Sequence, residues 1–380
     1  MIVLITVHGI GFQRAPSALD VSDGYADALH EGLRAHLGAK LGDDPNRLAA
    51  GGRGPVYVQS EFPPRSGATE AGAGRLGRWI ASGSVGIVGV PLAPPGAEVA
   101  HVALVYSGLE EQGTDLVALR GLEVLGLPSL ASYATLGGIA RMIVSDLEAL
   151  RRSHAAAGAA AHRGVFGRLL RRRGDEPPAD AAGTGSLASL RAFEDGVAAY
   201  VARNEHRERV RAFLRDAVSR VLARSDVDGV AVNGLSNGTV MAFDTIAALS
   251  PPSARGVRLL ITAGSPLRKY VDLFDWGRDA GAMRHLSGGW TNVWDPADWV
   301  ADPLGPPRGW RRGDPLPDGG GPGLFVVHDP DTGAELPRPV TDVQVDNVRD
   351  AAGGAPDPHD YWDNDSFCAA AAALISGALR

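Results

Sequence analysis

The chain has 380 residues, of which 44% are hydrophobic and 21% charged, so it has enough apolar material for the core of a globular protein. A formal net charge of −7 gives no general case for binding nucleic acid or an anionic membrane. The single cysteine, Cys368, excludes an intramolecular disulfide framework and any multi-cysteine metal site, and it fits a reducing compartment.

The chain begins with an apolar run, MIVLITVHGIGF. No basic segment precedes the run, and it meets His8 and a glycine pair instead of a small-residue cleavage site, which argues against a signal peptide. Residues 3–7 instead fit a buried strand of a parallel sheet. Because no stretch reaches the roughly 18 apolar residues of a membrane span, we expect a cytoplasmic protein without a transmembrane segment.

Strand and helix patterns alternate along the rest of the chain. Helical apolar periodicity follows the first strand at 22–38, with Ser22 or Asp23 as the expected N-cap, and recurs at 139–150 and 207–224. Short apolar runs predict strands at 55–62, 101–108, 229–233, 257–264 and 291–294. The first of these begins at a proline, which favours an edge position. The alternation predicts an α/β fold, with a mostly parallel central sheet and helices on both faces.

Two segments do not fit this core and are interpreted as insertions in a single domain spanning residues 1–380. Residues 63–97 are rich in glycine and proline yet apolar, which favours an apolar flap or lid. Residues 153–186 are of low complexity, with a basic run at Arg171–Arg173. Contact of this run with an acidic lipid or a partner is one reading, and a solvated loop is the favoured one.

The stretch GLSNG, residues 234–238, places Ser236 between two glycines where a strand pattern gives way to a helix pattern. A G-x-S-x-G match in a chain with 50 glycines is weak by itself, and a tight structural turn would also need small residues. The strand–turn–helix context favours the other reading, in which the serine is a nucleophile on a strained turn. Such a serine needs a base, an orienting acid and an oxyanion site.

The orienting acid is expected on a loop after a later strand, and the stretch NVWDPADWVADP offers Asp295, Asp298 and Asp302. Asp298 is followed by Trp-Val, which would return the chain to the core and leave the carboxylate in the loop. Asp295 precedes a proline and suits a turn-initiating role. The pattern therefore favours Asp298 as the acid.

The base is expected on a loop before the last helix, and His359 has this position, after a Gly/Pro-rich loop. A helix-capping histidine is the alternative, as is a metal cluster with nearby carboxylates, although closely spaced acids usually mark a helix N-terminus. The remaining histidines fit other roles. Three fall in helical patterns and are expected on the surface: His30, His36 and His206. His101 begins a strand, His285 precedes a bend, and the second insertion contains His154 and His162. His328 falls in a hairpin pattern, whose aspartates make a poor calcium loop.

The turn HGIG after the first strand can present backbone N–H groups to an oxyanion. Gly9 and Gly11 allow a sharp bend that frees the N–H of Ile10, and the N–H of Asn237 would be the second donor, at a helix N-terminus. A phosphate-binding loop is the rival, but the stretch lacks both the Lys-Ser/Thr of a P-loop and the spacing of a dinucleotide fold. His8 is expected to pack rather than to catalyse.

Taken together and in order, VHGIG, GLSNG, DPADWVADP and PHDYW resemble the α/β-hydrolase superfamily, in its serine esterase and lipase-like branch. The resemblance spans nearly the whole chain and implies the order nucleophile, acid, histidine, here Ser236, Asp298 and His359. Gly9, Gly11, Gly234 and Gly238 would be the motif glycines. About 60 residues separate Ser236 from Asp298 and Asp298 from His359, which leaves room for the crossover units of a parallel sheet.

The resemblance implies an eight-strand-type sheet and a hydrolase acting on a carboxylic ester, a thioester or an amide through an acyl-enzyme, without a metal or organic cofactor. The partner would be a small-molecule or lipid ester. The chain departs from the family in reaching its HG turn at residue 8, without the two strands that usually precede it. Acyl transfer by the same triad and a non-catalytic module that binds a partner remain open alternatives.

Overall fold

The computed structural model describes residues 1–9, 24–59, 90–106, 200, 204–274, 280–298, 300–312, 314–316, 323–328, 333–336, 340–347 and 360–379. The predicted helix at 139–150, the insertion 153–186 and most of the insertion 63–97 lie outside the described residues. Of the predicted site residues, Ile10, Gly11 and His359 lie outside them as well.

The core is a parallel sheet of eight strands, seven of them in the order β10-β7-β6-β5-β1-β4-β2, with β3 also paired to β4. Every pairing in this sheet is parallel among the described residues. The strands are β1 (Ile2–Val7), β2 (Leu41–Gly42), β3 (Val56–Gln59), β4 (Val99–Val105), β5 (Gly229–Leu235), β6 (Val257–Ala263), β7 (Gly289–Trp294) and β10 (Val340–Gln344). The predicted α/β fold is confirmed at this level, and β3 lies at an edge as its proline indicated.

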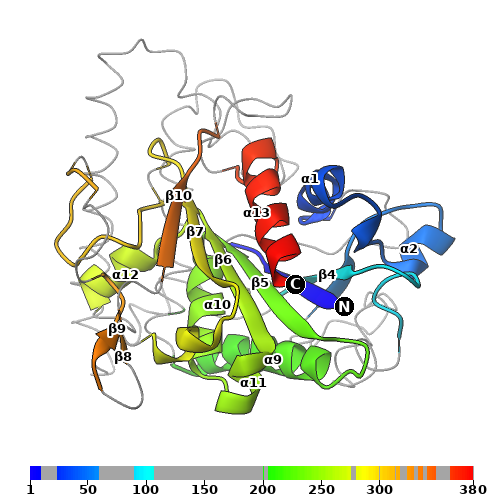
Figure 1. Cartoon of the computed structure of the whole chain (residues 1–380), viewed down its shortest axis with the longest axis horizontal. Coiled ribbons are helices and arrows are strands. Elements are labelled where there is room, and N and C mark those ends of the chain that lie inside the picture. Colours follow the sequence, from blue (N-terminus) through cyan, green and yellow to red (C-terminus); the bar gives the residue numbers. More distant parts are fainter. Residues whose placement is uncertain are drawn as a thin grey trace, which may run out of the picture.

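Helices cover both faces of the sheet, as Figure 1 shows. One face carries α9 (Asn204–Leu222), α10 (Asn237–Ala247) and α11 (Pro251–Gly256), and the other carries α1 (Asp27–Leu37) and α13 (Asp365–Ala378). Successive β1 side chains alternate between the two faces: Val3, Ile5 and Val7 belong to the α9–α10 core, and Ile2 and Leu4 to the α1–α13 core. Burial on both faces explains why β1 is apolar at every position but Thr6.

The helix α1 begins at Asp27, with Ala26 at its N-cap, so the prediction that Ser22 or Asp23 caps it was wrong. Leu29 and Leu33 are fully buried on its inner face, where each contributes about 1.5–3 kcal/mol of burial free energy. The same helix packs against α13, and Gly32 has no room for a side chain because Cys368 lies against it. Burial raises the pKa of the Cys368 thiol to about 12, so this cysteine is a packing residue.

Several smaller elements complete the described chain: η1 (Gly38–Lys40), α2 (Pro45–Ala49), α12 (Leu267–Phe274) and η3 (Gly281–His285). The predicted hairpin around His328 is present as the antiparallel pair β8 (Val327–His328) and β9 (Glu335–Leu336). Leu92 and Ala93, near the end of the predicted insertion 63–97, are buried in the α9–α10 core. This end of the segment is therefore part of the core.

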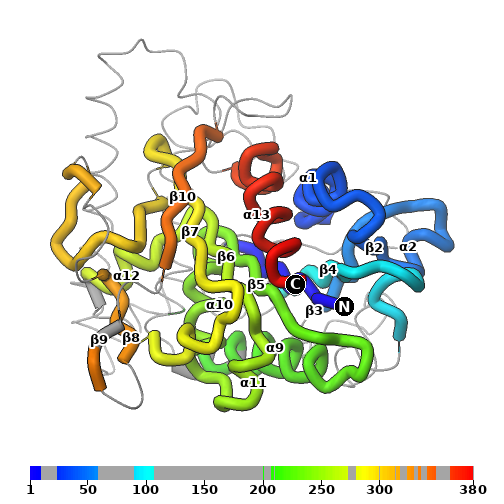
Figure 2. The backbone as a smooth tube through the Cα atoms, in the orientation of Figure 1, coloured from blue at the N-terminus to red at the C-terminus, as the bar shows by residue number. Residues whose placement is uncertain are grey.

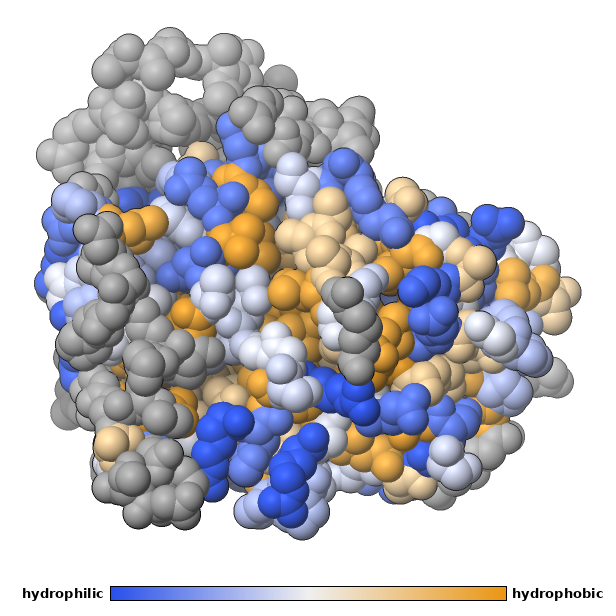
Figure 3. Space-filling view, in the orientation of Figure 1, coloured by the Kyte–Doolittle hydropathy of each residue, from blue (hydrophilic) through white to orange (hydrophobic). Residues whose placement is uncertain are grey.

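The two ends of the described chain lie at the same edge of the sheet, where Figure 2 marks both. Arg258 connects them: its guanidinium donates to the backbone oxygens of Ala378 (3.0 Å) and Asp228 (2.9 Å), and the Met1 ammonium pairs with the Asp228 carboxylate (2.6 Å). In the space-filling view of Figure 3, hydrophilic residues line the lower rim over α9 and α11. Because all strands are parallel, their carboxyl ends meet at the opposite edge, where a ligand site is expected in an open α/β sheet.

Candidate active site

Ser236 occupies the turn between β5 and α10, at the carboxyl edge of the sheet. Its backbone has φ 53° and ψ −129°, and among the described residues it is the one non-glycine with positive φ. A residue in so sparsely populated a region costs on the order of 1–3 kcal/mol and persists only where its surroundings enforce it. The serine is thus held in the strained strand–turn–helix geometry that its sequence context indicates.

Three glycines make room for this turn, and none of them could carry a side chain without a shift of its neighbours. A Cβ at Gly9 would lie 2.8 Å from the Cβ of Ser236, and one at Gly234 would lie 2.8 Å from the Cα of Thr239. At Gly238 it would come within 2.5 Å of the carbonyl oxygen of Val7. The close approach of β1 to the start of α10 therefore requires glycine at these positions.

Hydrogen bonds fix the backbone on both sides of Ser236. Its N–H donates to the carbonyl oxygen of Ala263 on β6 (2.9 Å), and its own carbonyl oxygen accepts from the Thr239 hydroxyl (2.6 Å). Ser265 lies 2.8 Å from that hydroxyl and accepts the N–H of Leu267 (3.2 Å), which ties the turn to α12. These bonds hold the backbone of the turn in place. Within the described residues, the Ser236 hydroxyl itself makes no hydrogen bond.

Asn237 is the first residue of α10, and its side chain is buried and directed away from solvent. The side-chain oxygen accepts a hydrogen bond from the hydroxyl of Tyr270 on α12 (2.6 Å). The first N–H groups of a helix have no partner within it and lie at the positive end of its dipole. The backbone N–H of Asn237 is therefore suited to an anionic oxygen, while its side chain braces the turn.

His8 is a structural residue of the β1 turn, in agreement with its predicted packing role. Its ring stacks on Tyr106, with centroids 3.9 Å apart, and meets the edge of Tyr25. Burial lowers the pKa of His8 to about 4, against the opposing effect of the Gly9 carbonyl, so the ring is neutral near pH 7. Its Nδ1–H donates to that carbonyl (2.7 Å), and its Nε2 accepts the N–H of Tyr106 (3.2 Å).

Asp295 and Asp298 lie in the loop that follows β7, and both are buried. The Asp295 carboxylate accepts the N–H groups of Ala297 and Asn347, both at 2.7 Å, and burial raises its pKa to about 6. Asp298 accepts the N–H of Val300 on Oδ1 (2.9 Å) and the hydroxyl of Tyr361 on Oδ2 (3.0 Å). Asp295 thus caps backbone groups, whereas Asp298 receives a side-chain donor from the C-terminal segment.

Asp302, the third acid of the predicted loop, belongs to a buried ion-pair cluster. Its carboxylate contacts the ammonium group of Lys269 on α12 and accepts a hydrogen bond from Arg312 (3.1 Å). Its backbone N–H donates to the backbone carbonyl oxygen of Ser265 (3.4 Å). Burial alone would raise the pKa of Asp302, but the two cations outweigh this effect and lower it. These contacts give Asp302 a structural role in anchoring the loop against α12.

His359 lies outside the described residues, and the chain becomes described again at Asp360. Two residues beyond His359, the Tyr361 hydroxyl accepts the backbone N–H of Asp295 (2.9 Å) and donates to Asp298. Asn364 is the N-cap of α13, and Asp365 lies in its first turn and bonds His36 on α1 (2.8 Å). The acids after His359 thus include a helix N-terminal charge, and the described residues contain no group of three side chains able to hold a metal ion.

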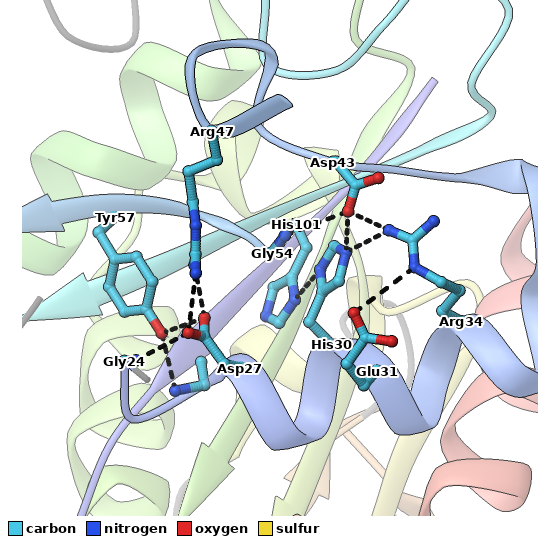
Figure 4. A network of polar contacts seen from close by, with 11 residues as sticks. Gly24, Asp27, His30, Glu31, Arg34, Asp43, Arg47, Gly54, Tyr57 and His101 are labelled. Atoms are coloured by element: carbon cyan, nitrogen blue, oxygen red, sulfur yellow. Dashed lines mark hydrogen bonds and ion pairs between the residues drawn. The ribbon is translucent and has the colours of Figure 1, made fainter. Parts of the chain in front are cut away.

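A second buried polar network lies between α1 and the sheet (Figure 4). The rings of His30 and His101 are parallel, with their Nδ1 atoms 3.1 Å apart. His30 is fully buried, so the prediction that it lies on the surface was wrong. His101 is the third residue of β4, so the prediction that it begins the strand was also wrong. His101 Nε2 lies 2.8 Å from the Thr6 hydroxyl, and His30 Nε2 lies 3.0 Å from Asp43, which also pairs with Arg34.

One arrangement of protons satisfies the chain of contacts from Asp43 to Thr6, although the Arg34 guanidinium, 2.8 Å from His30 Nε2, then faces a donor there and is held by Asp43 alone. The Asp43 carboxylate accepts from His30 Nε2, His30 Nδ1 accepts from His101 Nδ1, and His101 Nε2 accepts from the Thr6 hydroxyl. Burial, with the charge of Arg34, lowers the pKa of His30 to about 4, and burial lowers that of His101 well below its usual value. Both rings are therefore neutral near pH 7 and connect α1 to β4 and to the loop after β2.

No protein-family model matches the chain, and no curated protein matches it. Among the described helices, none is both long and apolar enough to cross a membrane. The candidate site therefore depends on its geometry alone. That geometry packs Gly9, after β1, against the turn of Ser236 and Asn237, and it places Asp298 on the loop after β7, two strands away from β5 in the sheet.

Proposed function

We propose that the protein is a serine hydrolase that cleaves a carboxylic ester through an acyl-enzyme. The observation that supports this most strongly is the strained backbone of Ser236, at φ 53°, held between glycines at the carboxyl edge of the sheet. A tight structural turn would be served better by glycine at this position, since only glycine adopts positive φ without strain. A serine at position 236 instead presents a hydroxyl in a fixed direction at the N-terminus of α10.

In the proposed reaction, His359 takes the proton of the Ser236 hydroxyl as its oxygen attacks the ester carbonyl. The N–H groups of Ile10 and Asn237 hold the oxyanion, and His359 then protonates the leaving alcohol. Water, deprotonated by the same histidine, attacks the acyl carbonyl. The bond to the Ser236 oxygen then breaks, this oxygen takes the proton back from His359, and the acid is released. Asp298 holds the imidazole in the required tautomer and stabilises its positive charge. None of these steps calls for a metal or an organic cofactor.

Chain geometry supports His359 as the base. In the sequence, His359 precedes the described Tyr361 by only two residues. The Tyr361 hydroxyl contacts the Asp298 carboxylate directly. Asp298 follows β7 and Ser236 follows β5, so both residues lie beyond the carboxyl ends of strands that are two apart in the sheet.

The test combines labelling with a substrate panel. A fluorophosphonate probe should react with Ser236, identified by mass spectrometry, and Ser236→Ala and His359→Ala should both prevent the reaction. A panel of esters of graded chain length then defines the substrate, and added alcohol acceptors separate hydrolysis from acyl transfer. A folded wild-type protein that stays unlabelled after long exposure would refute the proposal. A cytoplasmic location and a small-molecule or lipid ester as the substrate remain predictions.

A further inference from the structure

Tyr361 lies where the C-terminal segment meets the loop that carries the candidate acids. Its side chain is fully buried, and its ring packs edge-on against Phe367 of α13, with centroids 6.3 Å apart. Its hydroxyl accepts the backbone N–H of Asp295 (2.9 Å) and donates to Oδ2 of Asp298 (3.0 Å). One phenol oxygen thus joins two of the three acids of the loop, Asp295 through its backbone and Asp298 through its carboxylate.

The chemistry of these contacts gives the hydroxyl a fixed role. Burial, with the nearby carboxylate of Asp298, raises the pKa of Tyr361 well above its usual value, so the phenol keeps its proton throughout the working range of an enzyme. The N–H of Asp295 can only donate, so the phenol oxygen accepts there and its hydrogen is directed to Asp298. Together with the N–H of Val300 on Oδ1, it fixes the plane of the Asp298 carboxylate.

We infer that Tyr361 is a positioning residue that acts through Asp298, orienting its carboxylate and setting how strongly it attracts the imidazolium of the catalytic histidine. This inference rests on the proposed triad. A hydrogen bond to the charged form of an acid withdraws charge from it and lowers its basicity. Without the phenol, Asp298 would be more basic and would stabilise the imidazolium more strongly, so the histidine would lose its proton only at higher pH.

The experiment measures the rate of fluorophosphonate labelling of Ser236 from pH 5 to pH 9 in the wild type and in Tyr361→Phe. We expect the acid limb to move to higher pH, with labelling at least about fivefold slower at pH 6 and within about twofold of the wild type at pH 9. A purely structural role for Tyr361 predicts a uniform fall at every pH. An unmoved acid limb would overturn the inference.

Tyr200→Phe is the matched control. Tyr200 is also fully buried and also donates its hydroxyl to a carboxylate, that of Asp244 (2.9 Å), in the second half of α10. Its acid limb should coincide with that of the wild type. A limb that moves equally in both variants would show a general response to loss of a buried phenol and would also overturn the inference.

A second measurement covers the case in which Tyr361→Phe does not fold. Replacing the seven tyrosines of the wild-type chain with 3-fluorotyrosine keeps the rings and makes each hydroxyl a stronger donor. The acid limb should then move to lower pH, and no movement would contradict the inference. If the wild type labels at Ser236 and Asp298→Asn suppresses labelling, the proposed function stands whatever Tyr361 does. If the wild type does not label, both proposals fall.

Discussion

Gly238, at the start of α10, lies against the carbonyl oxygen of His8, at the end of β1, with no space for a side chain between them. We predict that Gly238→Ala lowers the free energy of unfolding by at least about 1–3 kcal/mol, because the clash is with backbone rather than with a movable side chain. Forcing β1 and α10 apart would also displace Ser236, so its fluorophosphonate labelling should be lost. Urea unfolding, followed by circular dichroism, measures the first effect.

Gly377→Ala is the matched control for this substitution. Gly377 lies in α13 and would meet nothing within 4 Å if it carried a Cβ. Alanine there should raise stability by about 0.5–1 kcal/mol through helix propensity and leave labelling unchanged. Similar urea midpoints for the two variants would contradict the argument that β1 and α10 require glycine at their contact.

The strain at Ser236 predicts an order of stability among its variants. Ser236→Gly should be more stable than Ser236→Ala by about 1 kcal/mol, since glycine relieves a positive φ at some cost in chain entropy, whereas alanine keeps the strained Cβ. Both variants lack the hydroxyl, so the comparison does not depend on catalysis. Urea midpoints that place Ser236→Ala at or above Ser236→Gly would show that the turn stores no strain at this residue.

The different partners of Asp295 and Asp298 predict different consequences for activity. Asp298→Asn should lower kcat for the fastest ester of the panel by roughly three to four orders of magnitude, as expected when the orienting carboxylate of a triad is lost. Asp295→Asn should cost less than about tenfold, because its contacts are with backbone N–H groups and an amide oxygen can still accept one of them. The reverse order would assign the acid to Asp295.

The sheet could be predicted from the sequence because its central strands carry a local signature. Strands buried on both faces are apolar at almost every position, as β1 and β4 are apart from Thr6 and His101, and the pattern reveals them without knowledge of their partners. The strained turn was predictable for a similar reason, since Gly234 and Gly238 flank Ser236 in the sequence. The edge strand β10 was missed, because two of its five residues are only partly buried and two are exposed.

The polar contacts could not be predicted, since they join residues that are far apart in the chain. His30 was assigned to the surface because a polar residue in an amphipathic helix usually lies there. Its burial depends on His101, 71 residues later, and on Asp43 in a loop. In the same way, nothing local to Tyr361 shows that its hydroxyl reaches Asp298, although the tyrosine follows the predicted base by only two positions.

The neutral histidine pair predicts a loss of stability in acid. Burial lowers the pKa of His30 to about 4 and that of His101 well below the 6.5 of the unfolded chain. Their contribution to stability is therefore present above pH 6.5 and is lost as the pH falls below it. Each histidine kept neutral in the fold costs about 1.4 kcal/mol per pH unit below 6.5. His101→Met should therefore show a smaller fall in unfolding free energy between pH 7.5 and pH 5.5 than the wild type.

The comparison between variants is needed because other groups titrate in the same range. His8, with a pKa near 4, adds to the loss in acid, whereas Asp295, with its pKa raised to about 6, opposes it. His36→Gln is the control, since His36 is exposed and bonds only to the exposed Asp365 among the described residues. A His101→Met protein with the same pH dependence as the wild type would show that His101 does not stay neutral in the fold.

Asp302 should be essential for stability and dispensable for chemistry, which separates it from Asp298. Its carboxylate lies against the buried Lys269 and accepts from Arg312. Asp302→Asn removes the charge that these cations face, and breaking a buried pair in this way costs about 3–5 kcal/mol. Asp216→Asn, which breaks the exposed pair with Arg220 on α9, should cost only about 0.3–0.5 kcal/mol.

The decisive measurement is made on the folded fraction of each variant. Labelling is measured without urea, at a temperature where circular dichroism shows Asp302→Asn to be folded. Its rate of Ser236 labelling should then be within about threefold of the wild type, since Asp302 acts by anchoring the loop. Asp298→Asn should instead have a urea midpoint closer to that of the wild type than Asp302→Asn has, and should lose labelling. A folded Asp302→Asn protein that fails to label, beside an Asp298→Asn protein that labels normally, would move the orienting acid to Asp302.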